Sequence, residues 1–170
     1  MKAMGKKIYI GVVGSGNCDK ETADIAERVG QLLAKEGAVV ICGGYGGVME
    51  ACSRGAASAG GMVIGVLSEE DRRGANPYLS ASLVTGMGQA RNAIIVGSSH
   101  AVIAISGGYG TLSEIALALK MNRPVIGINT WKIDQGDGKE HIICADNPEE
   151  AVKIALEISR EISGFVENDF

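Results

Sequence analysis

Two glycine-rich segments share a pattern that is typical of anion-binding loops. They are GGYGGVME at residues 43–50 and GGYGTLSE at residues 107–114. Each follows an apolar run and precedes a helical pattern, so its glycines let the main chain approach a ligand closely. The unpaired N–H groups at the start of each helix then favour an anion such as phosphate. The pattern predicts a phosphate-binding site built from both loops.

A third loop, in the segment GVVGSGN at residues 11–17, closes the first apolar run and should face the same ligand. It lacks the third glycine of a GxGxxG dinucleotide fingerprint, and no GxxxxGK[ST] motif of a nucleoside triphosphatase is present. The predicted ligand-binding residues of the three loops are Gly14, Ser15, Gly16, Gly43, Gly44, Gly46, Gly47, Gly107, Gly108, Tyr109, Gly110 and Thr111.

Two charged residues near these loops are candidates for chemistry. Arg91 follows the end of a predicted strand, and its guanidinium suits a phosphate or a base edge. Glu114 closes the second glycine motif, but Thr111 and Glu114 also fit a capping box, in which both side chains satisfy N–H groups at the helix start. From the residues alone, both roles of Glu114 stay open.

The elements that position these residues alternate between strands and helices. Apolar runs predict strands at 8–14, 38–42, 62–67, 81–85, 101–106, 124–128 and 141–145. Helical patterns cover 20–36, 46–59, 88–98, the segment from the second glycine loop to 121, and a last helix capped by Asn147. This alternation predicts one Rossmann-like α/β domain over residues 1–170, a doubly wound, mostly parallel sheet with helices on both faces. Such sheets bind ligands at the carboxyl ends of their strands.

Composition excludes several classes of partner. The 16 basic and 20 acidic residues give a formal net charge of −4, which disfavours nucleic acid. No apolar run reaches the ~18 residues that a membrane span needs, and no signal peptide opens the chain, so we expect a cytoplasmic protein. Two isolated histidines and the absence of a CxxC pair predict no metal site.

Arg91, GGYGTLSE and the upstream GGYGG resemble the LOG (Lonely-guy) superfamily, often labelled lysine decarboxylase-like. The chain is most similar to its molybdenum-cofactor carrier proteins and their uncharacterised relatives, over roughly residues 8–128. LOG enzymes are phosphoribohydrolases, and the resemblance implies that Arg91 and Glu114 are catalytic and that residues 107–111 bind phosphate. Two residues depart from the LOG motif: Asn92 replaces its lysine and Ser106 its proline.

Two functions are consistent with this resemblance. One is hydrolysis of a nucleoside 5′-monophosphate to free base and ribose 5-phosphate, with no cofactor required. The other is a non-catalytic molybdenum-cofactor carrier or nucleotide sensor, with molybdopterin or a nucleotide as its bound ligand. In both, the partner is a small phosphate-bearing molecule. The relatives also imply a homo-oligomer, a dimer or tetramer, in which helices 46–59 and 88–98 pack against a second copy.

Overall fold

The strands of the protein form one parallel sheet. A computed structural model describes residues 7–165 and places seven strands there in the order β4-β3-β2-β1-β5-β6-β7. Every neighbouring pair is parallel, which confirms the predicted Rossmann-like fold. The strands are β1 (Tyr9–Gly14), β2 (Val39–Cys42), β3 (Met62–Leu67), β4 (Ala81–Val84), β5 (Ala101–Ile105), β6 (Val125–Ile128) and β7 (Ile143–Cys144).

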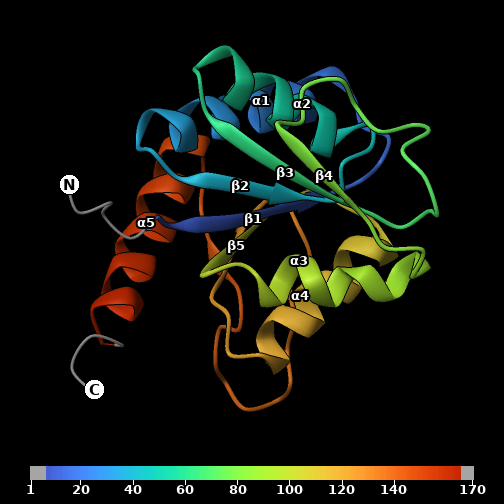
Figure 1. Ribbon diagram of the computed structural model, residues 1–170. Helices are drawn as coiled ribbons and strands as arrows, with labels where there is room; N and C mark the ends of the chain where they lie inside the picture. Colours follow the sequence, from blue (N-terminus) through green and yellow to red (C-terminus); the bar gives the residue numbers. More distant parts are fainter. Residues whose placement is uncertain (1–6, 166–170) are drawn as a thin grey trace.

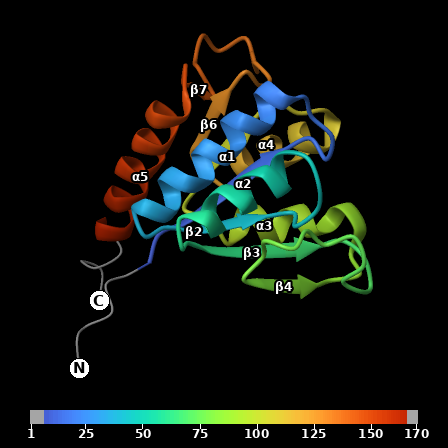
Figure 2. The same cartoon turned by 90° about the horizontal axis from the view of Figure 1, so that it is seen from above.

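Helices cover both faces of this sheet. Figure 1 shows α1 and α2 above it and α3 and α4 below it, and Figure 2 shows α5 beside α1. The helices are α1 (Lys20–Lys35), α2 (Val48–Ser58), α3 (Asn92–Gly97), α4 (Tyr109–Lys120) and α5 (Pro148–Phe165), with a 3-10 turn η1 (Gly88–Arg91) before α3. Among the helices of residues 7–165, none is both long and apolar enough to cross a membrane.

The central strands are apolar on both sides because a hydrophobic core lies on each face. In β1, Ile10 and Val12 pack into the core with α1, α2 and α5, whereas Val13 packs into the core with α3 and α4. Both cores therefore draw on alternate residues of the same strand, which explains why the strands read as continuous apolar runs.

The order of the strands creates the place where a ligand can enter. From β1 the chain moves outward through β2, β3 and β4, and then returns to β5 on the other side of β1. Gly14 at the end of β1 is paired with Ile105 at the end of β5. The connections that leave these two strands run to opposite faces of the sheet, so a crevice opens between them.

Local signals set most helix boundaries. Asp19 accepts a hydrogen bond from the Thr22 N–H (2.8 Å) at the start of α1, and Asn147 accepts one from the Glu150 N–H (2.9 Å) at the start of α5. The predicted helix at 88–98 differs in one respect. Its first turn is the tighter η1, in which the Ala90 N–H bonds three residues back to Met87, and the α-helix begins only at Asn92.

Helices α1 and α2 cross at close range because each has a glycine at the contact. A Cβ on Gly30 would overlap the carbonyl oxygen of Cys52, and a Cβ on Gly55 would overlap that of Glu27. This packing within one chain accounts for the small residues of α2, and the homo-oligomer stays a prediction.

We expect Gly55→Ala to lower the free energy of unfolding by about 1–3 kcal/mol, since the added methyl group must push α1 and α2 apart. Gly97→Ala is the matched control. A Cβ there meets no atom of residues 7–165 within 4 Å, and Gly97 does not have a positive φ. Denaturant unfolding of both variants measures the difference. Equal stability of the two would contradict the close crossing.

Candidate functional site

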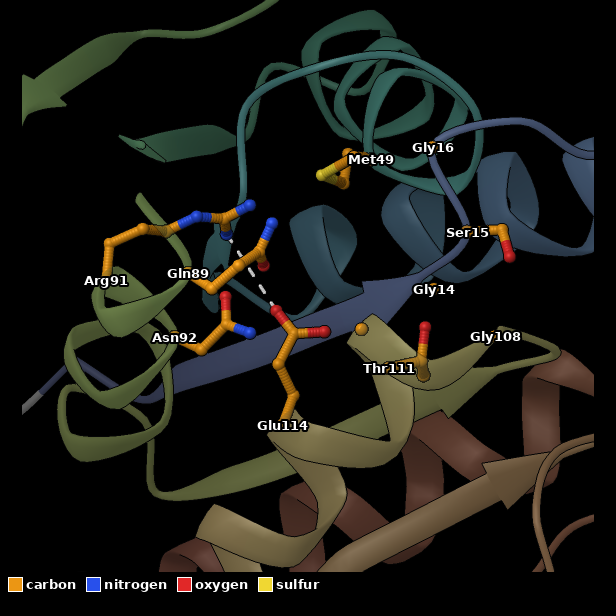
Figure 3. Close-up of a pocket in the computed structure, with 11 residues that line it drawn as sticks. Gly14, Ser15, Gly16, Met49, Gln89, Arg91, Asn92, Gly108, Thr111 and Glu114 are labelled. Atoms are coloured by element: carbon orange, nitrogen blue, oxygen red, sulfur yellow. Dashed lines mark ion pairs between the residues drawn. The ribbon is translucent and has the colours of Figure 1, made fainter. Parts of the chain in front are cut away.

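A pocket lies at the crevice between β1 and β5. Its walls come from the end of β1, the start of α2, the η1–α3 segment and the first turns of α4 (Figure 3). The lining residues are Gly14, Ser15, Gly16, Met49, Gln89, Arg91, Asn92, Gly108, Gly110, Thr111 and Glu114. The structure therefore brings Arg91 and Glu114 together with the loops that follow β1 and β5.

The two similar glycine motifs occupy different environments. The Ser15 carbonyl accepts a hydrogen bond from the Val48 N–H (3.0 Å) at the start of α2. A Cβ on Gly47 would overlap the same carbonyl, so the loop after β1 lies directly on the first motif. This loop covers Gly46 and Gly47, whereas Gly44 lies next to Leu67 and Gly43 next to Arg91. Accordingly, Gly43, Gly44, Gly46 and Gly47 are absent from the described pocket lining.

The second motif is open toward the pocket. A Cβ on Gly108 or Gly110 would meet no described atom within 4 Å, so the first turn of α4 has free space above it. No side chain of the described residues caps this helix start. The remaining two glycine-motif residues lie outside the lining: Gly107 packs against Thr111 at φ +106°, and Tyr109 is 84% exposed. The start of α4 is thus the part of the pocket suited to an anion.

The start of α4 also decides between the two roles that the sequence left open for Glu114. The helix begins at Tyr109, with Gly108 as its N-cap, so Thr111 and Glu114 both lie inside it. Neither side chain is in a position to form the capping box. Glu114 instead projects from the next turn into the pocket, where it is only 7% exposed.

Arg91 is buried opposite Glu114. Its Nη1 lies 3.8 Å from Glu114 Oε1, too far for a hydrogen bond, and its Nε and Nη1 have no hydrogen-bond partner within residues 7–165. Gly43 makes room for the guanidinium, because a Cβ there would lie 2.5 Å from Nη1. The first glycine motif therefore contributes to the pocket indirectly, by seating Arg91.

Burial raises the pKa of Glu114 to about 7, although the positive charge of Arg91 acts in the opposite direction. Of the lining residues that the structure describes, only these two can carry a charge on the side chain at neutral pH. Their summed charge is zero when Glu114 is ionised and +1 when it is protonated. The pocket is therefore more favourable to an anion after Glu114 takes up a proton.

Three residues that line the pocket were not among the ligand-binding residues predicted from the sequence: Met49, Gln89 and Asn92. Asn92 is 2% exposed, and its Nδ2 donates to Ser113 Oγ at 3.0 Å. Its place directly after Arg91 was the available signal. Met49 and Gln89 have side chains without a distinctive chemical pattern, and only the fold brings them to the pocket.

Ser106, which replaces the LOG proline, has a backbone conformation that proline cannot adopt. Its φ is +51°, whereas a proline ring fixes φ near −65°. Its N–H also donates to the Ile128 carbonyl at 3.0 Å, and proline has no N–H. The loop after β5 therefore has a shape that this chain could not keep with the LOG residue.

The pocket has no metal-binding cluster in the described part of the chain. Across residues 7–165, no group of three or more His, Cys, Asp and Glu side chains is placed to hold an ion.

The raised pKa of Glu114 predicts a pH-dependent stability. The folded protein keeps this proton between pH 4.5 and about 7, where the unfolded chain releases it. Compared with Glu114→Gln, the wild type should lose about 3 kcal/mol of unfolding free energy as the pH rises through this window. Denaturant unfolding of both proteins at pH 5 and pH 8 measures the loss. Parallel pH curves for the two would show that Glu114 titrates normally.

Comparisons with known proteins agree with this architecture. A protein of Archaeoglobus fulgidus, described as uncharacterized, is 45% identical over 154 residues, which cover 91% of this chain and 98% of its own. The structure is similar to the molybdenum cofactor binding protein of Rippkaea orientalis, with a TM-score of 0.84 and 37% identity over 91% of this chain and 98% of the other. It is also similar to the Moco carrier protein of Chlamydomonas reinhardtii, with a TM-score of 0.80 and 30% identity over 92% and 99% of the two chains.

The family assignment follows from the sequence match and is consistent with these structures. Residues 7–152, most of the chain and every residue that lines the pocket, match the SLOG cluster4 family. The predicted resemblance to the LOG superfamily and its molybdenum-cofactor carriers is confirmed. The chain belongs to the SLOG cluster4 family.

Proposed function

We propose that the protein holds a phosphate-bearing small molecule, the molybdenum cofactor or a nucleotide, in the pocket between β1 and β5 without cleaving it. The observation that carries this proposal is the guanidinium of Arg91, which is buried yet has two nitrogen atoms without a partner in the described residues. A buried cation that lacks hydrogen bonds is costly in free energy. An anionic ligand oxygen within reach of Arg91 would remove that cost.

The pocket offers two complementary features to such a ligand. The phosphate fits over the first turn of α4, where Gly108 and Gly110 leave the N–H groups accessible. Arg91 lies across the pocket and can bind a second oxygen of the ligand. Ser15 and Gly16, from the loop after β1, border the space between these two features.

The carrier function is favoured by the relatives and by one residue. A molybdenum cofactor binding protein and a Moco carrier protein are similar to this chain over nearly their whole lengths. Asn92 stands where LOG enzymes have a lysine, so the pocket has one cation instead of two. The molybdenum cofactor carries a phosphate and would be cargo here, with Arg91 and the start of α4 as its anchors.

Glu114 favours hydrolysis as a second candidate function, because it is an ionisable carboxyl group that faces the pocket near Arg91. In this reaction the N-glycosidic bond of a nucleoside 5′-monophosphate breaks, and its electron pair leaves with the base, which takes up a proton. Water supplies the new hydroxyl at C1′. Ionised Glu114 would stabilise the positive charge that develops on the ribose, as carboxylates do in glycoside cleavage.

We expect Arg91→Met to weaken binding of the molybdenum cofactor and of nucleoside 5′-monophosphates at least tenfold, since hydrogen bonds to a charged group are lost. Arg28→Met is the matched control. It removes the same charge from α1, where Arg28 pairs with Glu149 on the surface. Isothermal titration with both ligand types measures the affinities. Equal affinities for the wild type and Arg91→Met would refute the anion anchor.

Holding and cleavage predict different products. When the protein is incubated with a panel of nucleoside 5′-monophosphates, we expect no free base and no ribose 5-phosphate above the level without protein. Chromatography of the mixture measures both. Turnover by the wild type that is lost in Glu114→Gln would overturn holding as the only role and establish the hydrolase.

A further inference from the structure

Asn92 has its side-chain amide fixed in one orientation by two hydrogen bonds in series. Ser113 Oγ donates to the Gly110 carbonyl at 2.9 Å, so its hydrogen is already in use. The contact of 3.0 Å between Ser113 Oγ and the Asn92 side chain must then use a hydrogen from Asn92. The Nδ2 group therefore faces Ser113, and Oδ1 faces the other way.

Asn92 Oδ1 is consequently a buried acceptor without a donor. Asn92 is 2% exposed, and Oδ1 has no hydrogen-bond partner in the part of the chain that the structure describes. Figure 3 shows Oδ1 on the side of the pocket that holds Gln89 and Arg91, while Nδ2 points toward α4. A buried acceptor that stays unpaired costs free energy, and a ligand donor that reaches Oδ1 by displacing the side chains around it would remove this cost.

We infer that Asn92 is a specificity-determining residue, whose Oδ1 accepts a hydrogen bond from an N–H or O–H group of the bound ligand. This inference rests on the proposed function, because it assigns a selective contact within the same pocket. Asn92 and Arg91 are adjacent in the chain but have opposite hydrogen-bonding roles. Arg91 offers only donors, so it recognises an oxygen, whereas Asn92 Oδ1 recognises a donor.

The ligand class that fits both residues carries an anionic oxygen together with a hydrogen-bond donor. Two parts of the proposed ligands supply such a donor. One is the amino group of the 2-amino-4-oxo pyrimidine ring, which guanine shares with the pterin of the molybdenum cofactor. The other is a ribose hydroxyl. A site with a buried acceptor rejects an analogue without the donor, because its acceptor then stays unpaired.

Binding of three nucleotides distinguishes between the 2-amino group and the ribose hydroxyl as the donor. GMP and IMP differ by the 2-amino group, and GMP and 2′-deoxyguanosine 5′-monophosphate differ by the 2′-hydroxyl. We expect the wild type to bind GMP about fivefold or more tightly than one of the two analogues, as measured by isothermal titration. The analogue that loses affinity identifies the group that Asn92 contacts.

Two variants test whether Asn92 causes this preference. Asn92→Leu has a similar size without an acceptor, and we expect its ratio of GMP affinity to analogue affinity to fall to about one. Ser113→Ala keeps Asn92 but removes the partner that orients its amide, and it should reduce the ratio by at least half. The ratio is the informative quantity, because a purely structural defect weakens all three nucleotides equally.

The outcomes distinguish this inference from the function on which it rests. A wild type that binds the three nucleotides equally, or a preference that persists in both variants, overturns the role of Asn92 and leaves the binding function intact. Failure of the wild type to bind both GMP and the molybdenum cofactor removes the proposed function, and the inference with it. Binding of the cofactor without GMP leaves the function intact and overturns recognition of a donor group that guanine and the pterin share. Should Asn92→Leu not fold, Ser113→Ala alone decides.

Discussion

The buried guanidinium of Arg91 is the constraint on which the arrangement of the pocket depends. Within residues 7–165, its Nε and Nη1 have no hydrogen-bond partner, and Nη1 lies 3.8 Å from the carboxyl group of Glu114, beyond hydrogen-bond distance. Taking a cation out of water costs several kcal/mol even after the surroundings relax. Gly43, which leaves space for the guanidinium, and Glu114, which faces it, are therefore part of one electrostatic arrangement. In the proposed complex, an oxygen of the ligand completes this arrangement.

The topology explains why one glycine motif is open to the pocket and its near copy is covered. The motif after β2 lies next to the loop after β1 on the same side of the switch point, so Ser15 packs onto its helix start. The motif after β5 lies on the other side, where the crevice separates it from that loop. Similar local sequences thus lie in different environments, because strand order decides which helix start the neighbouring main chain covers.

The sequence predicted the fold well because its signals are local and redundant. Apolar runs, helical periodicity and caps such as Asn147 each indicate the same alternation of strands and helices. The prediction that Arg91 and Glu114 face one ligand came from their places after predicted strand ends, and their catalytic roles came from the family resemblance alone. The covering of Gly47 by Ser15 depends on packing between distant segments, which periodicity does not describe.

Helix boundaries were the weaker part of the prediction, and one of them has a chemical consequence. Thr111 and Glu114 could have capped α4 only if the helix had begun after Thr111. Because it begins at Tyr109, the carboxyl group of Glu114 is free to face the pocket. Likewise, the buried acceptor of Asn92 follows from the bond between Ser113 and Gly110, which lie on a different helix. Such contacts are set by tertiary structure.

The electrostatics of the pocket argue for holding a ligand over cleaving it. Hydrolysis needs an ionised Glu114, yet burial raises its pKa to about 7 even though the positive charge of Arg91 acts in the opposite direction. A phosphate bound nearby adds negative charge, which raises that pKa further. A second cation would counteract this effect, but Asn92 occupies the position of the LOG lysine and supplies none. Binding of a phosphate therefore favours the protonated form of Glu114, and a neutral carboxylic acid can donate a hydrogen bond to the ligand but cannot stabilise a developing positive charge on the ribose.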